Sequence, residues 1–139
     1  MWSHYAKSHT GFCVEYNLRN PFVMASRKVN YTNSYPQLTY PFEATDIFSL
    51  ALNKSTDWVY EDEFRSVINT EYDYPGFTDN EFVNLQADQV ASLYLGAKMN
   101  QANKRAFLSI IKQSDFEPEV FQAKLSENSF KLVFEKIKY

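Results

Sequence analysis

The chain has 139 residues and a formal net charge of −3 at pH 7, with 45% hydrophobic and 22% charged residues, three Gly and one Cys. A length of this order suits one domain with a core of its own. The composition excludes disordered, collagen-like and disulfide-stapled chains, and the absence of a basic surplus argues against nucleic acid as a partner.

The opening segment predicts a short helix. Four of its residues fall at the spacing of one helical stripe: Trp2, Tyr5, Ala6 and His9. Because Gly11 stands where a helix C-terminus is often capped, we expect the helix to run from Trp2 to about His9.

Strands and a second helix follow. Apolar and polar residues alternate over residues 12–16 and again over residues 28–32, which predicts two strands. Thr45 with Asp46 can cap a helix through residues 47–54, where apolar residues repeat at helical spacing.

The second half of the chain contains strand, helix and hairpin patterns. Residues 32–41 and 69–80 are predicted loops, and residues 91–96 a strand. Residues 101–113 form an amphipathic pattern whose inward side chains are expected to be Ala106, Phe107, Ile110 and Ile111. Residues 120–137 alternate on both sides of a central turn at 126–128, which predicts a hairpin.

Together these elements predict an α+β fold. Strands and helices are mixed without strict β-α-β alternation, so we expect a mixed sheet with about three to four helices. No linker or repeat divides the sequence, and residues 1–139 are therefore expected to form a single domain.

Residues 57–69 carry an ambiguous pattern. A helix would place Tyr60, Phe64 and Val67 on one face, whereas a strand would align Glu61, Glu63 and Arg65. Strand-forming residue types favour a strand over the second half, from about Glu63 onward.

The acidic pair Glu61 and Glu63 is the clearest chemical feature. On a strand, residues two apart point the same way with Cα atoms roughly 6.5–7 Å apart, so two carboxylates could flank one substrate. The alternative is an ordinary ion pair of Arg65 with Glu61 on a helix or with Glu63 on a strand.

The remaining reactive side chains give weaker signals. His4 and His9 lie on different sides of a helix, and a second cysteine is absent, so no metal site is expected. We expect His9 to be a packed, hydrogen-bonded imidazole and Cys13 a buried, inert thiol, whereas His4 is free to act.

The expected setting is the cytoplasm. No run approaches the 18 or so apolar residues of a membrane-spanning helix, and the N-terminus has no apolar signal region. A single cysteine, Cys13, is typical of a reducing compartment. We therefore expect no membrane partner.

Several motifs resemble one bacterial family, domain of unknown function 2971. Its signature, Met-Trp-x-His-Tyr-Ala-x-x-His-x-Gly-hydrophobic-Cys-x-Glu-aromatic, is similar to residues 1–16. Later motifs of the family are matched by Val29-Asn30-Tyr31, by Lys54, Trp58, Tyr60, Glu61, Glu63 and Arg65, and by Tyr94-Leu95-Gly96. The resemblance extends from Met1 to the helix near residue 111.

The resemblance carries an expectation about the N-terminus. In the family the His/Tyr/Cys segment follows a further N-terminal portion, which implies that Met1 corresponds to an internal methionine and that the chain is the C-terminal part of a longer architecture. Apolar surface that this portion would cover is then expected to be buried by self-association into a homo-oligomer or by the missing portion.

A second likeness concerns chemistry. A Glu-x-Glu strand that is preceded in the chain by a His/Tyr helix is similar to the second half of the ADP-ribosyltransferase fold. This likeness implies NAD as cofactor, Glu63 as the catalytic carboxylate on the ribose and Glu61 as its helper. His4, Tyr5, Trp58 and Arg65 are then the candidate substrate-binding residues. In those enzymes the first strand supplies an Arg or His that holds the nicotinamide side of NAD. This strand is missing here, which implies a site with impaired activity.

Two functions therefore stay open. One is a non-catalytic or truncated module of a defence, phage-related or toxin-type protein, without a cofactor, in which the acidic pair forms a buried cluster with Arg65 and Lys54. The other is an NAD-dependent transferase-like enzyme. An open cleft at the acidic pair with His4 and Tyr5 would favour the enzyme, and closure against Arg65 would favour the module.

Overall fold

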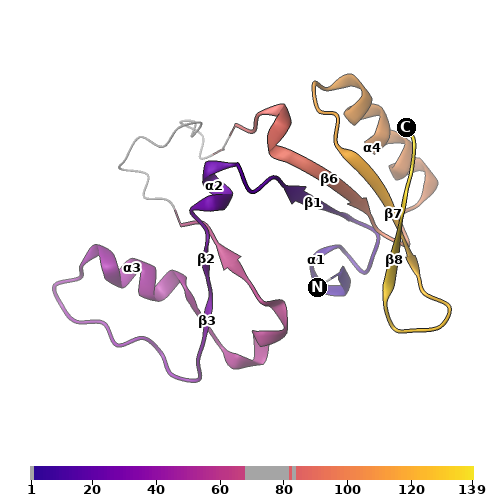
Figure 1. The fold of residues 1–139 in the computed structure, drawn as a ribbon. Helices are drawn as coiled ribbons and strands as arrows, with labels where there is room; N and C mark the ends of the chain where they lie inside the picture. Colours follow the sequence, from indigo (N-terminus) through magenta and orange to yellow (C-terminus); the bar gives the residue numbers. More distant parts are fainter. Residues whose placement is uncertain (1, 68–81, 83) are drawn as a thin grey trace.

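The computed structural model describes residues 2–67, 82 and 84–139. Its elements confirm the predicted α+β fold (Figure 1). In chain order they are α1 (Trp2–Tyr5), β1 (Phe12–Tyr16), α2 (Pro21–Met24), β2 (Arg27–Lys28), β3 (Asn30–Tyr31), α3 (Ala44–Ala51), β4 (Asn53–Lys54), the 3₁₀ helix η1 (Thr56–Glu61), β5 (Phe64–Arg65), the 3₁₀ helix η2 (Ala87–Gln89), β6 (Val90–Leu95), α4 (Gln101–Gln113), β7 (Glu119–Leu125) and β8 (Leu132–Lys136).

The main sheet has the strand order β1-β6-β7-β8. Strands β6 and β7 are parallel, and α4 connects them, whereas β1 and β8 pair antiparallel at the two edges. The core lies between α4 and one face of this sheet and is centred on Leu93, Leu95, Ile111 and Val120. Burial of these side chains is the main favourable contribution to the fold of this half.

A second part of the molecule is built from short elements. Strands β2 and β5 pair antiparallel, and β3 and β4 pair parallel, in two small sheets. Figure 1 shows these sheets gathered with α3 and η1, while α1 lies between them and the main sheet. The buried Val29, between β2 and β3, is 3% exposed.

Helix α1 is shorter than the sequence predicted. It ends at Tyr5, because Lys7, Ser8 and His9 adopt positive φ angles of 47°, 55° and 69°. Two backbone hydrogen bonds explain the turn: the His9 carbonyl accepts from the Lys98 amide at 2.9 Å, and the Gly11 carbonyl accepts from the Gly96 amide at 2.9 Å. Pairing with residues 96–98 replaces the last helical turn.

Helix α3 is displaced towards the N-terminus from its predicted position. It begins at Ala44 with Glu43 as its N-cap, so Thr45 lies inside the helix and does not cap it. Asp46 takes part in the capping at the third helical position, where its side chain accepts a hydrogen bond from the Glu43 amide at 2.8 Å. The helix ends at Ala51 because Asn53 and Lys54 pair with β3 instead.

The predicted strand over residues 28–32 is divided between two partners. Its first part pairs as β2 with β5, and its second part pairs as β3 with β4. The ambiguous segment is divided too: η1 ends at Glu61, Asp62 turns the chain with φ 47°, and β5 begins at Phe64. Of the strand predicted from about Glu63 onward, only Phe64 and Arg65 are strand within the described residues, and the first half of the segment is helical.

The second half of the chain follows its sequence patterns closely. Strand β6, helix α4 and the β7–β8 hairpin lie where they were predicted. The inward face of α4 differs, because Ala106 is exposed and Ile110 is 67% exposed, while Leu108 packs against the core with Phe107.

The other predictions on chain organisation have mixed outcomes. The predicted loop over residues 32–41 contains neither helix nor strand. The predicted loop over residues 69–80 lies outside the described residues. Within the described ranges, no helix is both long and apolar enough to cross a membrane.

Candidate functional site

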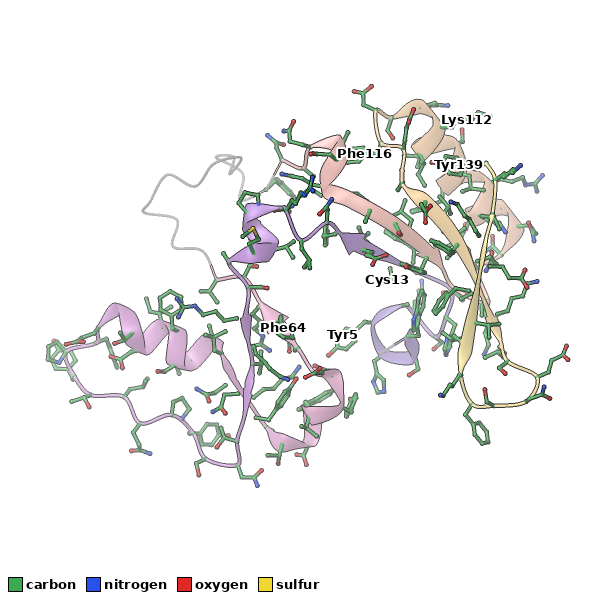
Figure 2. All side chains as sticks on the ribbon, in the orientation of Figure 1. Tyr5, Cys13, Phe64, Lys112, Phe116 and Tyr139 are labelled. Carbon is green, nitrogen blue, oxygen red and sulfur yellow. The ribbon has the colours of Figure 1, made fainter. Side chains whose placement is uncertain are left out.

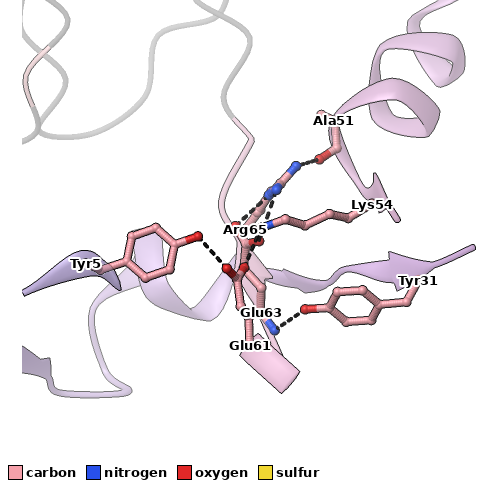
Figure 3. A network of polar contacts seen from close by, with 7 residues as sticks. All are labelled: Tyr5, Tyr31, Ala51, Lys54, Glu61, Glu63 and Arg65. Carbon is pink, nitrogen blue, oxygen red and sulfur yellow. Dashed lines mark hydrogen bonds and ion pairs between the residues drawn. The ribbon is translucent and has the colours of Figure 1, made fainter. Parts of the chain in front are cut away.

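Side chains from α1, β4 and η1 meet at one buried carboxylate. Glu61, the last residue of η1, is 5% exposed. One of its oxygens, Oε1, accepts a hydrogen bond from the Tyr5 hydroxyl, and Oε2 accepts one from Lys54 Nζ (Figure 3). Both oxygens of this carboxylate therefore have partners.

The second carboxylate of the pair is held from two sides. Arg65 Nε donates to Glu63 Oε1 at 2.7 Å, and Arg65 Nη2 donates to Oε2 at 3.0 Å. Lys54 Nζ also donates to Oε2, at 3.0 Å. The two parallel bonds from one guanidinium form the bidentate geometry that Arg and carboxylates prefer.

Two more contacts fix the site to the surrounding backbone. Arg65 Nη1 donates to the Ala51 carbonyl at 2.6 Å, and the Glu63 amide donates to the Tyr31 hydroxyl at 2.9 Å. We call Tyr5, Tyr31, Lys54, Glu61, Glu63 and Arg65 the polar network. Its members come from α1, the two small sheets, η1 and the turn that follows η1.

The turn at Asp62 explains why Glu61 and Glu63 both reach Lys54. The Ser55 side chain accepts from the Asp57 amide at 3.3 Å and begins η1, which then ends in the left-handed conformation of Asp62. On a regular strand, Glu61 and Glu63 would point in parallel. The helix end and the turn instead direct both carboxylates to Lys54.

The charges of the polar network balance. Lys54 and Arg65 face Glu61 and Glu63, two cations against two anions. Hydrogen bonds from Arg65, and then from Lys54, lower the pKa of Glu63 to about 2 against the opposing effect of burial. The bond to Lys54, followed by that to Tyr5, lowers the pKa of Glu61, and the bond to Glu61 raises the pKa of Tyr5. At neutral pH both carboxylates are ionised and Tyr5 is protonated.

An aromatic cluster lies beside the polar network. The His4 and Tyr60 rings are 6.1 Å apart, and the Tyr60 and Trp58 rings are 6.0 Å apart. Lys54 Nζ lies 5.1 Å from the centre of the Trp58 ring, within the range of a cation–π contact. Trp58 is 38% exposed. All six residues selected from the sequence are thus placed in or beside the same site.

The two alternatives for the acidic pair each describe part of the geometry. Glu63 is closed against Arg65, as the structural interpretation required. Glu61 faces Tyr5, as the cleft interpretation required, but the Tyr5 hydroxyl occupies its free oxygen. A hollow of about 220 Å³ adjoins Tyr5 and is lined by Trp2, Tyr5, Ala6, Phe12 and Cys13, without either glutamate of the pair.

Two predictions about reactive side chains need correction. Cys13 is exposed rather than buried, and its neighbour Val14 packs against the core instead. Desolvation, and then the charge of Glu15, raises the pKa of the Cys13 thiol. His9 stacks on Trp2 with ring centres 6.5 Å apart, but its Nδ1 is buried without a hydrogen-bond partner. Among the described residues, no group of three His, Cys, Asp or Glu side chains could hold a metal ion.

Tyr31 is the member of the polar network that sequence reasoning missed as a site residue. It lies 32 residues before Glu63, and no spacing rule connects positions so far apart. The only signal was its place in the Val29-Asn30-Tyr31 motif.

Fold and site define an α+β domain with a charge-balanced polar network in its second part, which Tyr5 joins from helix α1. Residues 1–66 match the model of a family described as "Protein of unknown function (DUF2971)", and every member of the polar network lies within this range. The match supports the resemblance that the sequence motifs indicated, while the motif at residues 94–96 lies beyond it. No curated protein and no solved structure matched the chain.

Proposed function

We propose that the chain is a non-catalytic module of a bacterial cytosolic protein of the defence, phage-related or toxin type, in which the polar network orders the fold. The bacterial setting rests on the family resemblance, whereas the family is described only as one of unknown function, so the type of protein is a proposal of its own. The non-catalytic role rests on the site itself, and the module would act as a homo-oligomer.

One observation carries the non-catalytic role: all four oxygens of Glu61 and Glu63 have partners within the chain. A carboxylate that exchanges protons with a substrate works best when its pKa is near the working pH. The pKa of Glu63 is instead held at about 2. A paired, ionised carboxylate of this kind is typical of a structural ion-pair network.

A second candidate is an NAD-dependent, ADP-ribosyltransferase-like enzyme. The convergence of Glu61 and Glu63 on Lys54, with His4 and Trp58 close by, favours it. In this alternative the ionised Glu63 would bind a ribose hydroxyl, and one of its present partners would have to give way.

Thermal melts of the parent chain and Glu63→Gln, with and without millimolar NAD, separate the two functions. The module predicts no shift with NAD and a clear loss of stability in Glu63→Gln. A shift with NAD in the parent that disappears in Glu63→Gln would contradict it and favour the enzyme. Nicotinamide release from NAD by the parent, above the rate in buffer, would do the same.

Glu135→Gln is the matched control. Glu135 pairs with Lys124 at 2.6 Å in the β7–β8 hairpin, but both side chains are more than half exposed. Such a pair contributes little to stability. Loss of charge alone should therefore leave the melting temperature almost unchanged, and any NAD response should persist in this variant.

A further inference from the structure

The hydrogen bond between Tyr5 and Glu61 joins two groups of opposite exposure. Tyr5 is 65% exposed, whereas the Glu61 side chain is 3% exposed. Figure 2 shows Tyr5 extending from α1 towards the second part of the molecule. The hydroxyl of a mostly exposed tyrosine thus donates to Oε1 of Glu61, the one oxygen of this almost fully buried carboxylate that Lys54 does not bind.

The same bond joins the two parts of the fold. Helix α1 is tied to the main sheet, because Trp2 contacts Phe134 of β8 with ring centres 6.2 Å apart and Ala6 is buried. Glu61 belongs to η1 in the second part. Beside the hydrogen bond, the rings of His4 and Tyr60 form a further contact between α1 and η1.

We propose that Tyr5 and Glu61 form a clasp, a contact by which α1 shields the Glu61–Lys54 pair from solutes and which opens without dismantling the rest of the polar network. This inference goes beyond the proposed module role, because it assigns the N-terminal helix a gating role. A solute that reaches the open clasp meets a carboxylate and an ammonium group beside the aromatic cluster.

The contacts explain why the clasp can open alone. Tyr5 gives up little packing when it leaves, since its ring is mostly exposed already. Glu61 keeps Lys54 as its ion partner, so no buried charge is left unpaired. Glu63 keeps both Arg65 and Lys54, and these bonds do not involve α1.

Carbodiimide labelling with glycine ethyl ester, read by peptide mass spectrometry, measures the access of solutes to each carboxylate. The parent chain should label slowly at Glu61. Tyr5→Phe keeps the ring and removes only the donor, and it should label several-fold faster at Glu61 with an unchanged rate at Glu63. Hydrogen exchange should quicken in residues 2–10 and 54–62 but not in β6 to β8.

Tyr94→Phe is the matched control. The Tyr94 hydroxyl donates to Glu15 Oε2 at 2.7 Å, a bond of the same chemical kind that lies within the main sheet. Its loss should leave Glu61 labelling as in the parent. The clasp is refuted if Tyr5→Phe labels like the parent, or if all carboxylates and amides become accessible together, since Tyr5 would then support the whole fold. Neither result bears on NAD binding, so the proposed function is tested separately.

Discussion

Glu63→Gln should lower the free energy of unfolding by about 1–2 kcal/mol at neutral pH. The pKa of Glu63 is held at about 2, whereas an unperturbed glutamate titrates near about 4.3. A difference of roughly two units corresponds to about 3 kcal/mol. Because the Glu63 side chain is 29% exposed, solvent screening reduces this contribution.

The effect should depend on pH with a defined sign. Folding lowers the pKa of Glu63, so its contribution is present above the unfolded value of about 4.3 and is lost as the pH falls through the folded value of about 2. The difference in unfolding free energy between the parent and Glu63→Gln should therefore be full near about pH 6 and narrow between about pH 4 and 2.

Urea unfolding followed by tryptophan fluorescence is a suitable assay, since Trp58 lies beside the polar network. Glu135→Gln should change the unfolding free energy by less than about 0.5 kcal/mol. If Glu63→Gln behaved like this control, and the difference from the parent stayed flat with pH, the ion pairs of Glu63 would contribute nothing and the reasoning would fail.

Three further substitutions test the packing. Leu95→Ala should cost about 2–5 kcal/mol in urea unfolding, because Leu95 is 0% exposed, and a cost below about 1 kcal/mol would contradict its central place. Gly96→Ala would place a Cβ 2.1 Å from the His9 carbonyl oxygen, so little folded protein is expected by circular dichroism; a parent-like melt would show that this close approach is wrong. Trp58→Ala should cost about 1 kcal/mol rather than the roughly 3–5 of a buried aromatic, because the ring is 38% exposed, and a larger loss would place it in the core.

Sequence patterns predicted best where an element packs against near neighbours in the chain. Helix α4 and the β7–β8 hairpin have clear periodicity and contact strands that precede or follow them directly. The predicted end of α1 was wrong because residues far along the chain decide it. Backbone hydrogen bonds to residues 96–98 override the local helical pattern and the glycine that follows it.

The residues of the site could be selected from the sequence, but their geometry could not. Glu61 and Glu63 were identified by spacing and motif, whereas the turn that directs both to Lys54 depends on the left-handed Asp62. The conflict between helix and strand in this segment was real, because the two halves adopt different structures. Aspartate tolerates the left-handed conformation more readily than most residues, but its presence in a sequence does not predict that conformation.

The strand order of the main sheet has a consequence for the assembly of the chain. Strands β6, β7 and β8 and helix α4 are consecutive in the chain. Strand β1 pairs with β6, which is synthesised more than half the chain length later. Loop closure over such a distance is slow, so β1 is expected to join after the C-terminal unit has formed. During synthesis its edge stays unpaired, with the apolar Phe12 and Tyr16 still uncovered. A chain that ends before Val90 would therefore lack the strands that pair with β1 and that helix α1 contacts through Trp2 and Phe134.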